Sequence, residues 1–218
     1  MLRPVSRPGT KLIVVRHGET TWNGVGRIQG HQDSPLSAGG RRQAEAVAAK
    51  LAEESLDFLA TSDLGRALAT ASAIAAVTEH EIFVDARLRE RCYGALEGLT
   101  WAEIERERPE VFRQLVSREP GYAPPGGESA EGFRDRVLAA CNELAAAAPG
   151  RTVAIVTHGG ALSILYRHVM GIPLGAPRTY TLANASINRF HVDEGRWTLE
   201  QWGEIDHLAG VALDDHER

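Results

Sequence analysis

Residues 12–20 read LIVVRHGET, a short apolar run followed at once by an arginine, a histidine and a glycine. Such a run is typical of a buried strand in a parallel sheet. Open α/β sheets bind their ligands just beyond the carboxyl ends of the strands. The stretch therefore predicts an α/β fold with Arg16, His17 and Gly18 at its functional edge. Arginine offers a planar fork of donors that suits phosphate, and histidine can act as a nucleophile or proton carrier near neutral pH.

Residues 153–160 repeat this arrangement, because the apolar run VAIV is followed by THGG. His17 and His158 would then lie at the ends of two strands and could face one pocket. A helix that starts near Gly159 would point free N–H groups at the same place, which favours a bound anion. The alternative is a helix cap with an incidental histidine. Two such sites in one chain favour the functional interpretation.

Two further segments bring charged residues toward this edge. Ser62 or Asp63 is expected to cap the helix that follows a strand at residues 57–61, and Arg66 lies one turn into that helix. An arginine there opposes the helix dipole, which is easier to understand if an anion binds nearby. Glu90 lies among arginines and could give a proton to a leaving oxygen if it were desolvated. The positive charges of the neighbouring arginines favour the ionised carboxylate instead. The sequence therefore leaves the protonation state of Glu90 open.

The rest of the chain alternates between predicted strands and helices. Strands are expected at residues 11–16, 57–61, 82–84 and 152–157, and helices at residues 37–54, 63–77, 129–148 and 160–170. Thr100 and Glu103 form a capping box, Pro109 starts another short helix, and a hairpin is expected over residues 188–202. This order predicts a single domain, residues 11–218. Its expected architecture is three-layer α/β/α, with a mostly parallel central sheet and a small helical cap insertion at about 99–129.

Composition narrows the class of partner. The chain has 218 residues and a formal net charge of −5, which argues against nucleic acid or an acidic membrane surface. Its two cysteines make a disulfide scaffold implausible, and no apolar run approaches the roughly 18 residues of a membrane span. Residues 1–10 do not resemble a signal peptide and are expected to form a loose tail. We therefore expect a cytoplasmic protein; the exposed end of the sheet and the hairpin could support a homodimer.

Candidate metal ligands are sparse in this sequence. His31 and Asp33 lie close together, but there is no His-Glu-x-x-His helix and no paired-cysteine pattern. A glycine-rich phosphate loop with its lysine and a Gly-x-Ser-x-Gly nucleophile turn are also absent. What remains is a set of two histidines, several arginines and one carboxylate. That set suits phosphoryl transfer through a covalent histidine, with neither a metal nor a cofactor.

Together these motifs resemble those of the histidine phosphatase superfamily, in its phosphoglycerate mutase-like branch. The resemblance covers about residues 11–202. It is carried by RHGET with Trp22-Asn23, Gln29-Gly30, Leu36-Ser37 with Gly39, Ser62-Asp63-Leu64 with Arg66, Glu90-Arg91 with Tyr93-Gly94, Glu97-Gly98, PGGES at 125–129, HGG at 158–160, and Asn184.

The resemblance implies a role for each matching residue. His17 resembles the nucleophile that becomes phosphohistidine, and Glu90 resembles the general acid that later activates water. The pocket that grips the phosphoryl oxygens would comprise Arg16, Arg66 and His158, helped by Asn23 and the N–H of Gly159. The rest of the substrate site would include Gln29, Gly30, Arg91 and Tyr93.

Departures from the family pattern bear on the substrate. The glycolytic mutases carry a lysine and paired arginines for a substrate carboxylate after the acid loop, whereas residues 98–126 hold no lysine and only scattered arginines. The resemblance therefore favours a histidine acid-type phosphatase acting on small phosphorylated metabolites, with phosphoglycerate mutase as the alternative. A non-catalytic binding protein is a third hypothesis, which the presence of His17, Glu90 and His158 opposes. Specificity is expected from the cap, through residues such as Phe112 and Tyr122.

Overall fold

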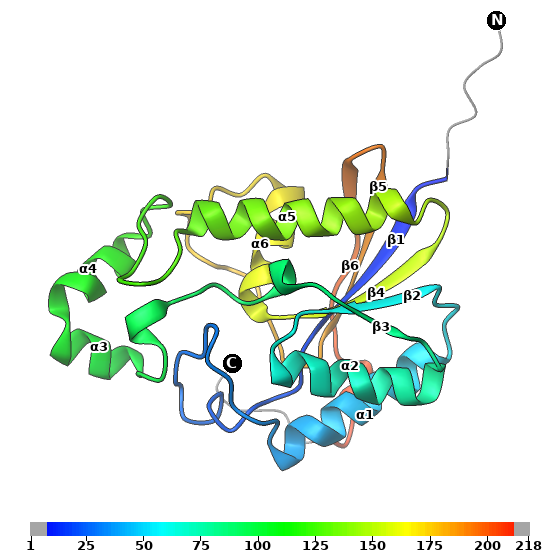
Figure 1. Cartoon of the computed structure of the whole chain (residues 1–218), viewed down its shortest axis with the longest axis horizontal. Coiled ribbons are helices and arrows are strands. Elements are labelled where there is room, and N and C mark those ends of the chain that lie inside the picture. Colours follow the sequence, from blue (N-terminus) through cyan, green and yellow to red (C-terminus); the bar gives the residue numbers. More distant parts are fainter. Residues whose placement is uncertain (1–7, 212–218) are drawn as a thin grey trace, which may run out of the picture.

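The computed structural model describes residues 8–211, which form a six-stranded sheet in the order β3-β2-β4-β1-β5-β6 (Figure 1). The first four strands in this order are parallel to one another, whereas β5 runs antiparallel to β1 and β6 antiparallel to β5. The strands are β1 (Thr10–Arg16), β2 (Phe58–Thr61), β3 (Ile82–Val84), β4 (Thr152–Thr157), β5 (Ile187–Asp193) and β6 (Arg196–Glu204). The predicted α/β class with a mostly parallel sheet is confirmed.

Helices cover both faces of this sheet, which gives three layers (Figure 1). α1 and α2 pack on one face, and α5 and α6 pack on the other. Two short helices, α3 and α4, lie beyond the sheet at the left of Figure 1. The helices are α1 (Ala38–Ala52), α2 (Gly65–Thr78), α3 (Trp101–Glu107), α4 (Pro109–Ser117), α5 (Ala130–Ala147) and α6 (Gly159–Met170), with 3-10 turns η1 (Ala86–Leu88), η2 (Gly94–Leu96) and η3 (Asp206–Leu208).

The two middle strands, β1 and β4, are buried on both faces. Leu12 and Val14 belong to the core beneath α5 and α6, whereas Ile13 and Val15 belong to the core beneath α1 and α2. This alternation follows from the two-residue period of a strand, and burial on both faces explains why the run is continuously apolar. β1 and β4 end side by side, so the residues that follow each strand arrive at the same edge of the sheet.

Most local signals act as the sequence predicts. The Thr100–Glu103 capping box is present at α3, Pro109 begins α4, and Ser129 caps α5. The exception is α2, whose N-cap is Leu64 without a side-chain cap bond. Ser62 and Asp63 do not cap this helix, because other side chains engage them. The Ser62 hydroxyl pairs with His158, and Asp63 forms an ion pair with Arg89.

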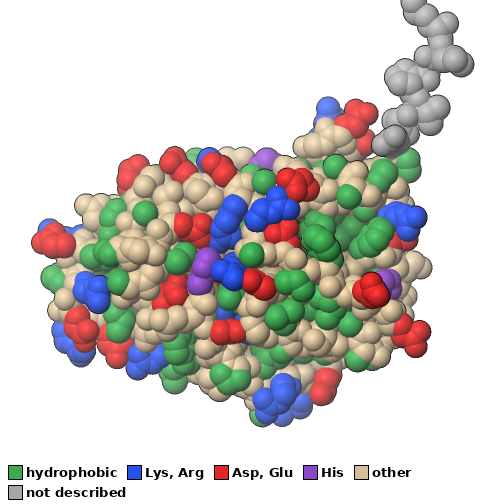
Figure 2. All heavy atoms as spheres, in the orientation of Figure 1, with side chains coloured by type: hydrophobic (Ala, Val, Ile, Leu, Met, Phe, Trp, Pro, Cys, Tyr) green, Lys and Arg blue, Asp and Glu red, His purple; other side chains and the backbone are tan. Residues whose placement is uncertain are grey.

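The sheet ends at β3, on the side where Figure 2 shows hydrophobic side chains gathered between α5 and α2. Phe83 and Val84 of this strand are exposed. A homodimer at this end of the sheet stays a prediction. Of the predicted N-terminal tail, residues 1–7 lie outside the described residues, and Thr10 already belongs to β1. In the part of the chain that the structure describes, no helix is long and apolar enough to cross a membrane.

Candidate active site

His17 follows β1 directly and lines a cavity of about 470 Å³. Its Nδ1 lies 2.7 Å from the carbonyl oxygen of Gly18. Because a carbonyl only accepts hydrogen bonds, Nδ1 carries the ring proton and the lone pair lies on Nε2. Burial, followed by the positive charges of Arg66 and Arg16, holds the pKa of His17 well below its usual range. The imidazole is therefore neutral at neutral pH, which is the form that a nucleophile requires.

His158 follows β4 and packs against His17, with the two ring centroids 5.2 Å apart. It is fully buried, and its Nε2 lies 2.7 Å from the hydroxyl of Ser62. Burial, and next the charge of Arg66, lowers the pKa of His158 as well. Two neutral rings can pack in this way without charge repulsion. His158 lies behind the nucleophile and is not among the residues that line the cavity.

Arg66 reaches the cavity from the first turn of α2 and is only 1 % exposed. Its Nη1 donates to the carbonyl of Gln32 and to the carboxylate of Asp33, both at 2.9 Å, and Nη2 donates to Gly30 at 2.8 Å. Its buried Nε has no hydrogen-bond partner among residues 8–211. A buried donor left unpaired costs about 1–3 kcal/mol. An acceptor from a bound ligand would remove this cost.

Arg16 lines the same cavity at the end of β1, and its Nη1 donates to the carbonyl of Leu182. The two arginines enter from different elements, one from a central strand and the other from α2. Their guanidinium groups bring positive charge to the cavity that the neutral imidazole of His17 lines. Such a set of donors suits an anionic group with several oxygens, such as a phosphoryl group.

Glu90 brings a carboxylate to this cationic cavity. One of its oxygens accepts from the N–H of Arg91 at 2.7 Å, and the other accepts from the N–H of Gly160 at 2.8 Å. A Cβ on Gly160 would lie 2.0 Å from the Glu90 carboxylate, so glycine is required for this approach. The first turn of α6 therefore fixes the position of the carboxylate.

Most of the site residues expected from the sequence line this one cavity: Arg16, His17, Asn23, Gln29, Gly30, Arg66, Glu90, Tyr93 and Gly159. Burial raises the pKa of Tyr93 to about 12, so its hydroxyl stays protonated at neutral pH. Arg91 differs from the expectation and does not line the cavity. Its guanidinium donates to the carbonyls of Tyr122 and Glu128, both at 3.0 Å, and so binds the loop before α5 instead of a substrate.

The lining of the cavity shows which residues of the cap, from which specificity is expected, reach the site. Trp101 of α3 lines it, but Phe112 packs edge-on against Trp101 and Tyr122 lines a separate cavity of about 110 Å³. The lining residues that the sequence did not indicate are Gly26, Arg27, Ile28, Ser163, Arg178 and Leu182, whereas Gly160 belongs to the HGG motif. No local motif marks Arg178, because a long irregular segment after α6 carries it to the site.

The side chains first weighed as metal ligands have other partners. Nε2 of His31 lies 2.9 Å from the carbonyl of Glu90, and Asp33 pairs with Arg66. Within residues 8–211, no group of three or more His, Cys, Asp or Glu side chains is placed to hold a metal ion. The guanidinium groups that line the cavity belong to Arg16, Arg27, Arg66 and Arg178.

Comparison with known families matches residues 12–205 to the histidine phosphatase superfamily (branch 1). The chain belongs to this superfamily. It is 39% identical over 216 residues to a probable phosphoglycerate mutase of Salmonella choleraesuis, covering 95% of this chain and 99% of that protein. Among solved structures it resembles YhfR of Bacillus stearothermophilus, with 35% identity, a TM-score of 0.85, and coverage of 91% and 99%. It also resembles a mycobacterial glucosyl-3-phosphoglycerate phosphatase, with 32% identity, a TM-score of 0.79, and coverage of 92% and 100%.

RHGET and HGG, which follow the neighbouring strands β1 and β4 of this histidine phosphatase, both lie within the region that matches the superfamily. The protein is an enzyme of the superfamily, either a phosphatase or a mutase. Relatives of both kinds cover nearly the whole chain, so family membership by itself does not choose between the two activities.

Proposed function

We propose that this enzyme is a phosphomonoesterase that hydrolyses small phosphorylated metabolites through a phosphohistidine at His17. One observation carries the proposal: the hydrogen bond from Nδ1 to Gly18 leaves a neutral Nε2 lone pair in a cavity that also holds Arg16, Arg66 and Glu90. Phosphoryl transfer needs a nucleophile, positive charge around the equatorial oxygens and a proton for the leaving group. These residues supply each of the three.

The reaction then consists of two in-line displacements. Nε2 of His17 attacks phosphorus, the P–O bond to the leaving group breaks, and Glu90 gives a proton to the departing oxygen. Water next attacks the phosphohistidine while Glu90 takes a proton from it, and inorganic phosphate leaves with the imidazole restored. Arg16 and Arg66 offset the charge on the phosphoryl oxygens in both steps.

His17→Asn tests the nucleophile with p-nitrophenyl phosphate as substrate. The variant should lose nearly all turnover, and rapid acid-free quenching of the wild-type enzyme should trap phosphate on His17. His80→Asn is the matched control, because His80 lies outside the cavity. Normal turnover by His17→Asn would contradict the proposed mechanism.

Assay of the purified enzyme with 3-phosphoglycerate and a bisphosphoglycerate primer separates hydrolysis from the mutase alternative. A phosphatase releases inorganic phosphate, whereas a mutase returns the phosphoryl group to give 2-phosphoglycerate. We expect phosphate as the main product. Rapid formation of 2-phosphoglycerate with little free phosphate would assign the mutase activity instead.

A further inference from the structure

The segment that carries Glu90 has little regular structure of its own. Residues 90–93 lie between the turns η1 and η2 and belong to no helix or strand. Backbone carbonyls in such a segment need partners from elsewhere. Two of these partners are Arg136 of α5 and Glu128, neither of which lines the cavity.

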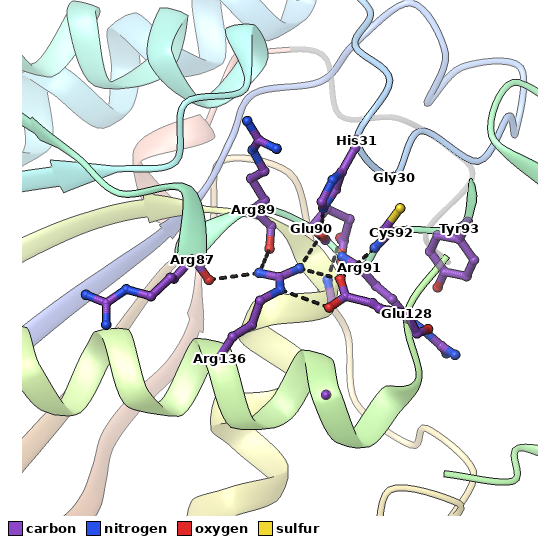
Figure 3. A network of polar contacts seen from close by, with 12 residues as sticks. Gly30, His31, Arg87, Arg89, Glu90, Arg91, Cys92, Tyr93, Glu128 and Arg136 are labelled. Atoms are coloured by element: carbon purple, nitrogen blue, oxygen red, sulfur yellow. Dashed lines mark hydrogen bonds and ion pairs between the residues drawn. The ribbon is translucent and has the colours of Figure 1, made fainter. Parts of the chain in front are cut away.

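Arg136 uses all five of its N–H donors on Glu128, on the carbonyl of Glu90 and on two carbonyls that precede it (Figure 3). Nη1 donates to the carbonyls of Arg87 and Arg89, both at 2.8 Å. Nη2 donates to the carbonyl of Glu90 at 2.7 Å and to Glu128 at 2.5 Å, and Nε donates to the second Glu128 oxygen at 3.0 Å. The rigid guanidinium therefore fixes the acid segment, residues 90–93, to α5 at the carbonyl of Glu90, and it also holds the carbonyls of Arg87 and Arg89.

Glu128 extends this contact beyond Glu90. Its carboxylate accepts from the N–H of Cys92 at 2.7 Å, and its own N–H donates to the carbonyl of Cys92 at 3.0 Å. The neighbouring loop approaches so closely that a Cβ on Gly127 would lie 2.6 Å from the Cys92 carbonyl. The PGGES motif thus joins the acid segment to the start of α5.

We propose that Arg136 and Glu128 are positioning residues. They hold Glu90 at the place relative to His17 from which it can transfer a proton to the leaving group. The inference rests on the proposed function. Arg136 donates to the backbone carbonyl of Glu90, which Nε2 of His31 also contacts, while Gly160 fixes the carboxylate, so the acid is held from two sides. The hydrogen bonds of Arg136 go to Arg87, Arg89, Glu90 and Glu128, so its loss should act on Glu90 before it acts on His17 or the phosphate-binding arginines.

The test compares two esters that differ in their need for an acid. Nitrophenolate leaves without a proton, whereas the alkoxide of glycerol 3-phosphate requires one. For Arg136→Met, kcat/KM for the alkyl ester should fall about hundredfold, the scale of general acid catalysis, while kcat/KM for p-nitrophenyl phosphate stays within about threefold. Because Glu90 also activates water, the variant should show a burst of nitrophenol and accumulate phosphohistidine.

Controls separate positioning from folding. Arg134→Met, on the same helix with an exposed ion pair to Asp135, should behave like the wild type. Arg136→Lys should recover part of the alkyl-ester activity. If Arg136→Met does not fold, Glu128→Gln replaces it as the test variant, because it keeps the shape of the side chain, and it should show the same loss on the alkyl ester alone. Equal losses on both esters, or no loss, would overturn the inference. A wild-type enzyme that cleaves neither ester would instead refute the proposed function.

Discussion

A neutral nucleophile is the feature of His17 that solution measurements can test most directly. Burial and two neighbouring guanidinium groups hold its pKa below the usual value near 6.5. NMR titration of the imidazole between pH 5 and 8 should therefore find His17 unprotonated at pH 6.5. Removal of positive charge in Arg66→Met should move the titration to higher pH, whereas Arg87→Met should not. Protonation of the wild-type ring at or above pH 6.5 would contradict the electrostatic argument.

Asp33 is a residue whose importance appears only in three dimensions. It pairs with a guanidinium that is 1 % exposed, and it holds that guanidinium toward the cavity. Asp33→Asn should lower kcat/KM about tenfold on every ester, less than the ~hundredfold or more expected when the arginine itself is lost. Asp85→Asn, which weakens the ion pair to Arg87, should leave kcat/KM unchanged. An unchanged kcat/KM for Asp33→Asn would show that the carbonyls of Gln32 and Gly30 suffice.

Residues that directly follow central strands were the predictable part of the site. The positions of Arg16, His17 and His158 follow from the pairing of two parallel strands, which a sequence pattern can reveal. Asp33 and Arg178 lie in irregular segments, and their approach to the site depends on packing between distant parts of the chain. Arg91 was expected in the substrate site from the family resemblance, and a resemblance in sequence does not fix which way a long side chain turns.

At the scale of elements, the segment after α6 contributes to the cavity as much as the cap does. Arg178 lines it, so its guanidinium can meet an anionic group beyond the phosphoryl. Arg178→Met should lower kcat/KM for 3-phosphoglycerate more than for glycerol 3-phosphate, an ester of similar size without the carboxylate. Equal losses on the two esters would remove Arg178 from substrate selection. Phe112→Ala, which removes a ring that packs on Trp101 outside the cavity, should have a smaller effect on this ratio.

The elements themselves were predictable because each carries a local signal. Apolar runs gave the strands, and Ser129 and Pro109 gave helix starts. The predicted cap of α2 failed for a reason that no local pattern contains: Ser62 and Asp63 each have a distant partner. A side chain that could cap a helix serves another contact when tertiary structure offers one.

For the whole molecule, the two buried histidines make stability depend on pH. Both resist protonation in the folded state, whereas both titrate near 6.5 in the unfolded chain. Below about pH 6.5 the unfolded chain binds more protons, so stability is complete above this pH and falls as the pH falls. Each ring can contribute up to about 1.4 kcal/mol per pH unit.

Urea unfolding at pH 7.5 and 5.5 measures this dependence. The wild-type free energy of unfolding should fall between the two pH values, and a His17→Asn, His158→Asn double variant should show a smaller fall. His80→Asn is the control for the substitution itself. Equal falls in the wild type and the double variant would mean that other groups govern acid unfolding.

Because β1 is a central strand, the two parts of the active site should differ in how easily they open locally. The amide of His17 donates to Thr157 at 2.9 Å, within the most deeply covered part of the sheet, whereas the acid segment depends on side chains from α5. Hydrogen–deuterium exchange should therefore reach residues 90–93 well before residue 17, because sub-global openings expose weakly supported segments first. At low urea, an enzyme opened only there would still accept a phosphoryl group from p-nitrophenyl phosphate, yet would release it slowly.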